Sequence, residues 1–178
     1  MKKLILLFVV YVSLMSCKKD RNENSPLHDK VDGFYKIISA NSNSEEDLND
    51  DNKFSKDLFL EIPLLKTSTL DVVVNKVGNS FHLLWLEQDD HSSNLQTYNT
   101  EGMIYKFNFD INNNLFSPIS YKNQNQSEAL AAPVEMMLLK DGIISCKIMR
   151  LIKTSKGTVE LKVTAVYQKD PSIQRSFN

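Results

Sequence analysis

The stretch TVELKVTAVYQ, residues 158–168, alternates apolar and polar side chains with a period of two. Successive side chains of a β-strand point to opposite faces, so this alternation predicts a strand with one buried face. The stretch MIYKFNFD, residues 103–110, repeats the pattern. The side chains predicted to face inward are Val159, Leu161, Val163, Ala165 and Tyr167 in the first stretch, and Met103, Tyr105, Phe107 and Phe109 in the second.

The same reading along the chain predicts about eight strands with turn residues between them. Asp141-Gly142 and the run Asn112–Asn114 are typical of tight hairpins, because Gly and Asn tolerate the positive φ that such turns need. Short connections make neighbouring strands antiparallel, and no strand–helix alternation indicates a parallel sheet. The fold is therefore predicted to be all-β, an antiparallel meander. The predicted strands are 33–40, 69–76, 80–88, 102–110, 114–122, 133–140, 143–153 and 158–168.

One short helix is predicted after the first strand, in SKDLFLEI, residues 55–62. Ser55 is a favourable N-cap, Phe54 and Phe59 have the spacing of a hydrophobic staple, and Pro63 ends the helix. The stretch SEALAA, residues 127–132, is a second candidate for a helical turn.

The chain begins with a basic, then apolar, segment. Lys2 and Lys3 precede the apolar run Leu4–Leu14, which has 11 residues. A membrane-spanning helix needs about 20 apolar residues, so this run is too short to cross a bilayer. A positive start, a short apolar run and a small residue before a break are typical of a secretory signal peptide.

The tetrapeptide Leu14-Met15-Ser16-Cys17 resembles the lipobox of bacterial lipoproteins. This resemblance implies a signal peptide over residues 1–16, cleavage before Cys17, and a diacylglycerol on the Cys17 thiol. The protein would then be held in the cell envelope through this anchor. Lys18 stands where some inner-membrane lipoproteins carry an Asp, which favours the outer membrane.

The rest of the chain divides by composition. Residues 17–30 have almost no apolar side chains after the cysteine, which predicts a lipidated Cys17 and a flexible tether. Residues 31–170 are predicted to form the β-barrel domain, and residues 171–178 a flexible tail. Cys146, the second of two cysteines, has no partner for a disulfide once Cys17 is acylated, and its apolar neighbours predict burial. Without residues 1–16 the chain has 19 basic and 22 acidic residues, a net charge of −3 that does not favour nucleic-acid binding.

A second resemblance concerns the start of the domain. Gly33-Phe34-Tyr35 resembles the entry strand of lipocalin-like lipoproteins. Residues 38–62 are similar to a recurrent opening of that group, in which Asp-Leu-Asn and a few polar residues precede a Ser-x-Asp-Leu helix. The resemblance implies a lipocalin-like antiparallel barrel of about eight strands, wide enough for side chains or one small ligand.

The acidic stretch DLNDDNKFSKDL, residues 47–58, has partial calcium-loop spacing. Asp47, Asn49 and Asp51 stand at positions 1, 3 and 5 of such a loop, where oxygen ligands converge on one cation. Position 12 needs a bidentate carboxylate and holds Leu58. Calcium is therefore one interpretation, and a solvated acidic loop that caps the following helix is the other.

The sequence shows no catalytic motif, so we expect a binding protein and no enzyme. Tyr35, Trp85, Tyr105 and Phe107 are predicted to line a pocket for a small apolar or amphipathic ligand. The alternative is a protein–protein interaction module of the envelope (an inhibitor, immunity or assembly factor) with a filled core. A cavity of about 300 Å³ or more favours the ligand, and a filled interior with an exposed apolar patch favours the protein partner.

Overall fold

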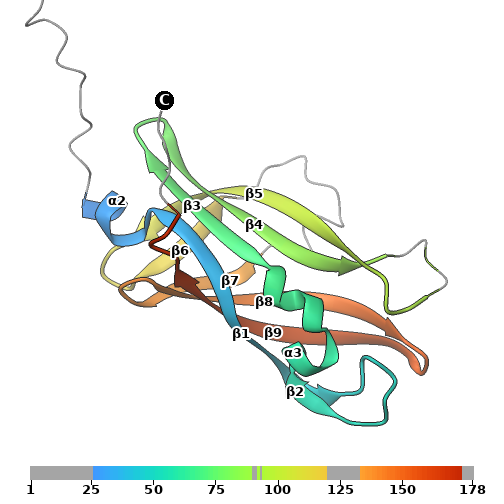
Figure 1. Ribbon diagram of the computed structural model, residues 1–178. Coiled ribbons are helices and arrows are strands. Elements are labelled where there is room, and N and C mark those ends of the chain that lie inside the picture. Colours follow the sequence, from blue (N-terminus) through green and yellow to red (C-terminus); the bar gives the residue numbers. More distant parts are fainter. Residues whose placement is uncertain (1–25, 90–91, 93, 120–132, 174–178) are drawn as a thin grey trace, which may run out of the picture.

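A computed structural model of the protein describes residues 26–89, 92, 94–119 and 133–173 (Figure 1). The helical elements are α2 (Pro26–Val31), α3 (Leu58–Glu61) and the 3-10 helix η1 (Pro63–Thr67). The strands are β1 (Gly33–Glu46), β2 (Ser55–Asp57), β3 (Thr69–Asn75), β4 (Gly78–Gln88), β5 (Tyr98–Asp110), β6 (Leu115–Ile119), β7 (Pro133–Lys140), β8 (Ile143–Thr154) and β9 (Gly157–Lys169).

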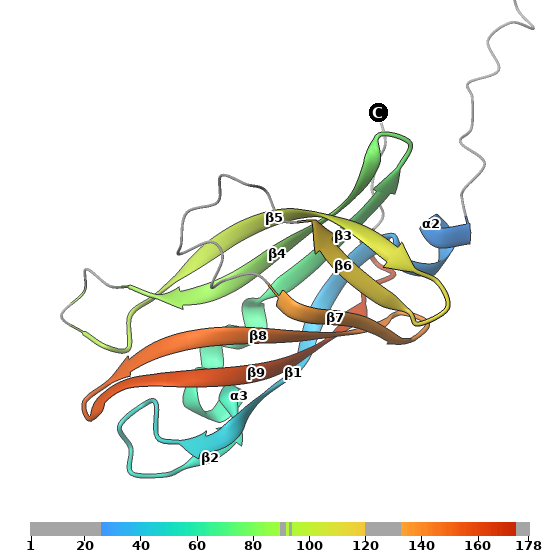
Figure 2. The ribbon, with the colours of Figure 1, turned by 180° about the vertical axis from the view of Figure 1, so that it is seen from behind.

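Eight strands form one closed antiparallel sheet. They follow each other in the order β1-β3-β4-β5-β6-β7-β8-β9, and β9 pairs back with β1. The two opposite views in Figures 1 and 2 show the sheet curving round on itself. The predicted all-β meander and lipocalin-like barrel are therefore confirmed.

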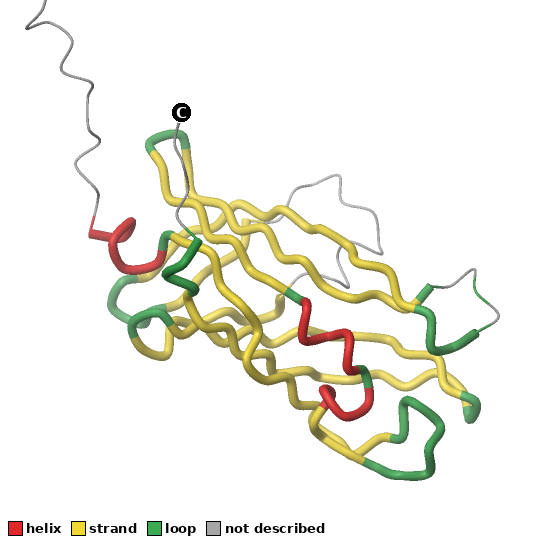
Figure 3. Tube along the Cα trace, in the orientation of Figure 1, coloured by secondary structure: helices red, strands yellow, loops and turns green. Residues whose placement is uncertain are grey.

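One edge of β1 pairs with two different strands. Residues 33–36 pair with β3, whereas residues 41–46 pair with the short strand β2. Because β3 starts only at Thr69, opposite Leu84, the last residues of β4 have β5 as their only sheet neighbour. The barrel wall therefore has a gap between the second half of β1 and the end of β4, and α3 and η1 lie across it (Figure 3).

The other edge of β1 closes the barrel against β9. The pairing register shifts between Ile37 and Ser39, so Ile38 is an extra residue in β1. Such a β-bulge moves the inward-facing positions by one residue. Tyr35 and Ile37 face the core before the bulge, and Ala40 and Ser42 face it afterwards.

The interior is filled according to the predicted alternation. Met103, Tyr105 and Phe107 of β5 are buried, and Ile104 and Lys106 between them are exposed. In β9 the side chains of Leu161, Val163, Ala165 and Tyr167 are all buried. Cys146 on β8 is fully buried, as predicted, and burial raises the pKa of its thiol.

The predicted hairpin turns are also present. Gly142 lies between β7 and β8 with φ of 73°, and Asn114 lies between β5 and β6 with φ of 55°. β1 and β5 are longer than the predicted strands 33–40 and 102–110. Residues 120–122 of the fifth predicted strand and the candidate helix 127–132 lie outside the described residues.

The helix predicted over residues 55–62 was partly wrong. Ser55 begins strand β2 instead of capping a helix, and β2 pairs with the end of β1. The helix α3 starts at Leu58, and its N-cap is Asp57, whose carboxylate accepts a hydrogen bond from the Phe59 N–H at 2.9 Å. Pairing with the end of the preceding strand β1 therefore overrides the local capping signal at Ser55.

The tether prediction needs a correction at its end, because residues 26–31 form α2. Val31 is fully buried, and its carbonyl accepts a hydrogen bond from the Tyr35 hydroxyl at 2.7 Å. Lys30 Nζ donates to Asn114 Oδ1 at 2.7 Å, which fastens α2 to the turn between β5 and β6. The folded part of the chain therefore begins by Pro26. Residues 17–25 lie outside the described residues.

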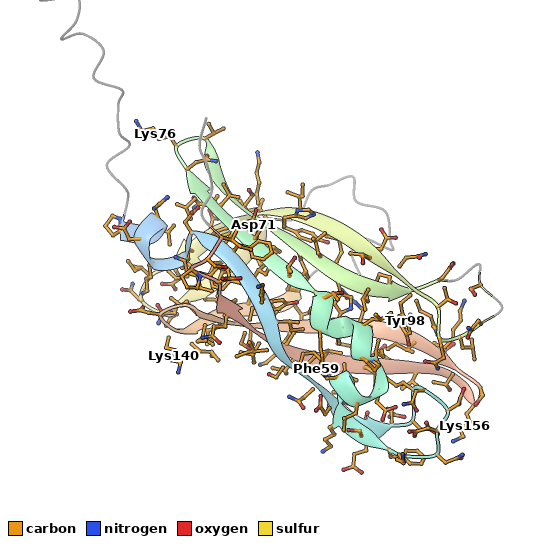
Figure 4. The ribbon with its side chains drawn as sticks, viewed as in Figure 1. Phe59, Asp71, Lys76, Tyr98, Lys140 and Lys156 are labelled. Atoms are coloured by element: carbon orange, nitrogen blue, oxygen red, sulfur yellow. The ribbon has the colours of Figure 1, made fainter. Side chains whose placement is uncertain are left out.

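The barrel has two distinct ends. The end that we call the α2 end carries α2 and the turns β3–β4, β5–β6 and β7–β8, with Lys76 and Lys140 labelled there in Figure 4. The opposite end, which we call the loop end, carries the connections β1–β2 and β4–β5 and the turn β8–β9, where Lys156 is labelled. Cys17 precedes α2 in the sequence, so the chain reaches the barrel at its α2 end.

Among the described residues, none of the helices is both long enough and apolar enough to cross a membrane.

An ion pair reinforces the closing seam between β1 and β9. Lys36 Nζ lies 2.6 Å from Asp170 Oδ2, and the Asp170 N–H donates to the Phe34 carbonyl at 2.8 Å. The hydrogen bond from Lys36, followed by those from Ser172, lowers the pKa of Asp170 from its ordinary 3.8 to about 2.

We predict that Lys36→Met raises the pKa of Asp170 and weakens this seam. A depressed carboxyl pKa contributes stability that is present above the unfolded pKa and is lost as pH falls through the folded pKa. Between pH 4 and pH 2 the wild type should therefore lose more unfolding free energy than Lys36→Met. NMR titration of the Asp170 carboxyl and urea unfolding measure both effects, with Lys162→Met on the outward face of β9 as the control. An unchanged Asp170 titration in Lys36→Met contradicts the assignment.

Candidate functional site

The four predicted pocket residues all face the barrel interior. Tyr35, Trp85, Tyr105 and Phe107 are each at most 3% exposed. They do not form one pocket, however. Tyr35 lies toward the α2 end and bonds to Val31, whereas Trp85 lies toward the loop end, where it pairs with Glu101 of β5.

A column of aromatic rings fills the half of the barrel near the α2 end. The ring centroids of Phe81 and Tyr105 are 5.3 Å apart, those of Phe107 and Phe116 are 5.1 Å apart, and Phe109 meets Phe116 edge-on at 4.8 Å. Such distances are those of directly packed aromatic pairs. Phe107 is therefore a core residue of this column.

The other half of the interior holds a buried cation. Arg150 on β8 is 5% exposed, and its guanidinium lies over the Trp85 ring at 5.3 Å from the centroid. Arg150 Nε is 3.0 Å from Glu87 Oε1, and Arg150 Nη1 donates to the Met149 carbonyl at 2.8 Å. Burial lowers the pKa of Arg150, and the charge of Glu87 opposes that change. Burying a guanidinium is costly unless it is paired, and the Glu87 carboxylate offsets part of this cost.

Two buried tyrosine hydroxyls have no hydrogen-bond partner among the described residues. Tyr98 Oη and Tyr167 Oη are both shielded from solvent. Burial raises the pKa of Tyr98 to about 12, with a smaller contribution from the charge of Glu61. Burial also raises the pKa of Tyr167. The charge of Arg150 partly offsets this increase. Buried polar groups are nearly always paired, so these two hydroxyls are unusual features of the interior.

A small cavity adjoins this cluster. Its volume is about 20 Å³, close to the space of one water molecule. Trp85, Glu87, Tyr98 and Arg150 line it on the barrel side. Leu58, Ile62 and Leu65 line it on the side of α3 and η1.

The segment 58–67, which comprises α3 and η1 and which we call the plug, covers this cavity. Leu58, Ile62 and Leu65 are buried, whereas Leu60 is 65% exposed and Leu64 is 58% exposed. The plug is joined to the wall by the Ile37 N–H, which donates to the Ser68 carbonyl at 3.4 Å. Glu61 on the plug is also buried, and its Oε2 accepts the Leu48 N–H at 2.9 Å. Figure 4 shows Phe59 on α3 and Tyr98 toward the loop end.

The predicted calcium loop is a hydrogen-bonded turn in the structure. Asp47 accepts the N–H groups of Asp51 and Asn52 at 3.0 and 3.2 Å, and its Oδ2 lies 3.7 Å from Lys156 Nζ. Asn49 Oδ1 also accepts the Asp51 N–H, at 3.1 Å. No cluster of three or more His, Cys, Asp or Glu side chains that would suit a metal ion occurs in the described part of the chain. Calcium at Asp47, Asn49 and Asp51 stays a prediction.

A wider hollow of about 390 Å³ lies outside the barrel at the α2 end. It is open to solvent, and both acidic and basic side chains line it, among them Asp29, Lys30, Asp141 and Lys169. Four of its six lining residues carry charged side chains, so it does not resemble a site for an apolar ligand.

Arg150, Glu87 and Tyr98 were not among the site residues predicted from the sequence. Arg150 was detectable from its position. In the strand predicted over residues 143–153, Ile144, Cys146, Ile148, Arg150 and Ile152 share one parity and are all buried. A charged residue at an inward position is the signal that points to a functional interior. Glu87 and Tyr98 gave no such local signal.

Comparisons with protein-family models, with curated proteins and with solved structures gave no match to this chain.

We predict that Leu65→Ala destabilises the protein by about 2–5 kcal/mol, the usual cost of truncating a buried leucine. The matched control is Leu64→Ala on the exposed face of the same element, which should change stability by less than about 0.5 kcal/mol. Urea unfolding monitored by circular dichroism gives both values. Equal losses in the two variants would show that the plug does not pack on the barrel as described.

Proposed function

We propose that the protein is a lipid-anchored lipoprotein of the bacterial cell envelope whose barrel binds a small apolar or amphipathic ligand, without catalysis. The observation that carries the ligand part is the buried polar cluster beneath the plug. Arg150 and the Tyr98 hydroxyl, which has no hydrogen-bond partner among the described residues, line the cavity together with mostly apolar side chains. Ligand sites are mostly apolar, with a few polar groups that fix the orientation of the ligand.

The proposed anchor is Cys17, which the lipobox-like tetrapeptide ending at this residue supports. Acylation with two or more chains holds a protein stably on a bilayer. The chain from Cys17 leads to the α2 end, so this end would face the membrane and the loop end would face away. Lys18 supports the outer membrane as the location.

The alternative function, an envelope interaction module with a filled core, is favoured by a different observation. The aromatic column packs the α2 half of the interior solidly, and the remaining cavity is about 20 Å³. Leu60 and Leu64 also expose apolar surface on the outer face of the plug. The ligand proposal therefore requires that the interior under the plug becomes larger when the ligand binds.

We predict that Cys17→Ala moves the protein from the membrane fraction to the soluble fraction, because the thiol that accepts the lipid is gone. Fractionation followed by immunoblotting measures the distribution. Cys146→Ala is the matched control, since Cys146 is buried in the barrel and should leave the protein membrane-bound. Full membrane retention of Cys17→Ala would contradict the anchor.

We predict that the domain from Lys18 onward binds the neutral apolar dye N-phenyl-1-naphthylamine at one saturable site. This chain contains every strand of the closed barrel and its whole described core. The dye fluoresces on entering an apolar site, and the sole tryptophan, Trp85, should transfer excitation energy to it. Non-saturable binding, or no binding, would contradict a ligand site in the barrel and favour the interaction module.

A further inference from the structure

The geometry points to a defined ligand class and route of entry: an apolar chain with an oxyanion head group, carboxylate or phosphate, which enters sideways by displacing the plug and places its head group on Arg150. This inference rests on the proposed function and specifies it. Three features of the structure support it: the gap in the wall, the residues that fill it and the polar groups beneath it.

Three apolar side chains of the plug occupy space in the wall gap. Leu58, Ile62 and Leu65 fill the wall gap and line the cavity. Removing one buried leucine side chain opens on the order of 150 Å³. Three such side chains leave a space of roughly 300 Å³ or more, which is the lower bound of ordinary ligand pockets. Withdrawal of the plug therefore turns a water-sized cavity into a ligand-sized one.

The second step concerns what withdrawal disrupts. No described strand pairs with residues 58–67, so moving the plug breaks no ladder of the barrel sheet. The closing seam between β1 and β9 lies on the other edge of β1 and stays intact. An apolar ligand chain that replaces the three buried side chains restores the apolar contacts that their removal costs. The exchange conserves the strand pairing of the barrel, and it breaks the hydrogen bond from the Leu48 N–H to Glu61 Oε2 on the plug.

The third step identifies the head group. Arg150 is a fixed planar donor that matches carboxylate and phosphate geometry. Its present partner, Glu87, has a side chain that is 32% exposed, although the Oε1 atom that faces Arg150 is shielded from solvent. A ligand oxyanion would then take the place of the Glu87 carboxylate. The Tyr98 hydroxyl, unpartnered among the described residues, supplies a further donor at the same cavity.

Glu87 therefore has a specific role, that of an internal competitor for the guanidinium. Removing its charge while keeping its shape should help an anionic ligand, because the competing anion is gone. A purely structural ion pair predicts the opposite, since its loss leaves the buried Arg150 charge without the Glu87 carboxylate and loosens the site. The variant Glu87→Gln thus separates the two roles.

The test titrates the domain from Lys18 onward with dodecanoate, dodecyl phosphate and dodecanol, each below its micelle concentration. Trp85 is the sole tryptophan and lies against Arg150, so its emission reports on the site directly. We expect both anions to bind roughly tenfold to hundredfold more tightly than dodecanol, the range of a charge-assisted hydrogen bond. The tighter of the two anions identifies the head group as carboxylate or phosphate.

Three variants complete the test. Arg150→Gln should bind the anions and dodecanol equally, Glu87→Gln should bind the anions more tightly than the wild type, and Leu64→Ala should behave as the wild type. Hydrogen exchange followed by mass spectrometry monitors the plug. On addition of the tighter anion, amides of residues 58–67 should exchange faster, while those of β8 and β9 should not.

Each of the remaining outcomes contradicts one part of this proposal or the proposed function. Equal binding of dodecanol and the anions by the wild type, or undiminished discrimination by Arg150→Gln, overturns the head-group assignment and leaves the proposed ligand function standing. Weaker anion binding by Glu87→Gln overturns the competitor role, and slower or unchanged exchange in residues 58–67 overturns entry through the plug. If neither the three ligands nor the neutral dye binds, the proposed function itself fails.

Discussion

The double pairing of β1 is the constraint on which the rest of the structure depends. The middle of β1 pairs with β9 and closes the barrel, whereas the pairing of β1 with β3 ends at Lys36. The bulge at Ile38 keeps inward side chains inward on both sides of the bend. A strand that serves two neighbours in this way closes the sheet at one end and leaves a gap in the wall at the other.

The gap explains why the two halves of the interior differ so much. Near the α2 end the sheet is complete, and Phe81, Tyr105 and Phe107 pack into a solid column. Near the loop end the wall is completed by side chains of the plug, a segment held by packing and a few hydrogen bonds. The charged pair of Arg150 and Glu87 lies in this second half. The fold thus places its buried polar groups beside the part of the wall that is not tied into the sheet.

The sequence predicted the regular part of this arrangement. Alternation in residues 103–110 and 158–168 is a local signal, because each side chain's direction follows from its neighbours, and the buried faces were predicted correctly. The start of α3 was predicted wrongly. Ser55 satisfies the local capping rules, but it pairs with the end of β1 instead. The bulge at Ile38 and the pairing of Glu87 with Arg150 depend on contacts between distant strands, which no local pattern encodes. Of these features, only the inward-facing position of Arg150 could be predicted from the local sequence pattern.

We propose that this barrel carries a ligand beneath the plug. The most direct measurement is native mass spectrometry of the domain from Lys18 onward, expressed for export and purified without detergent from its own cell envelope. We expect a mass excess that corresponds to one amphipathic anion per chain and that occurs in a smaller fraction of the molecules in Arg150→Gln. A clean unliganded mass, together with a stable envelope protein retained on the same preparation, would contradict it.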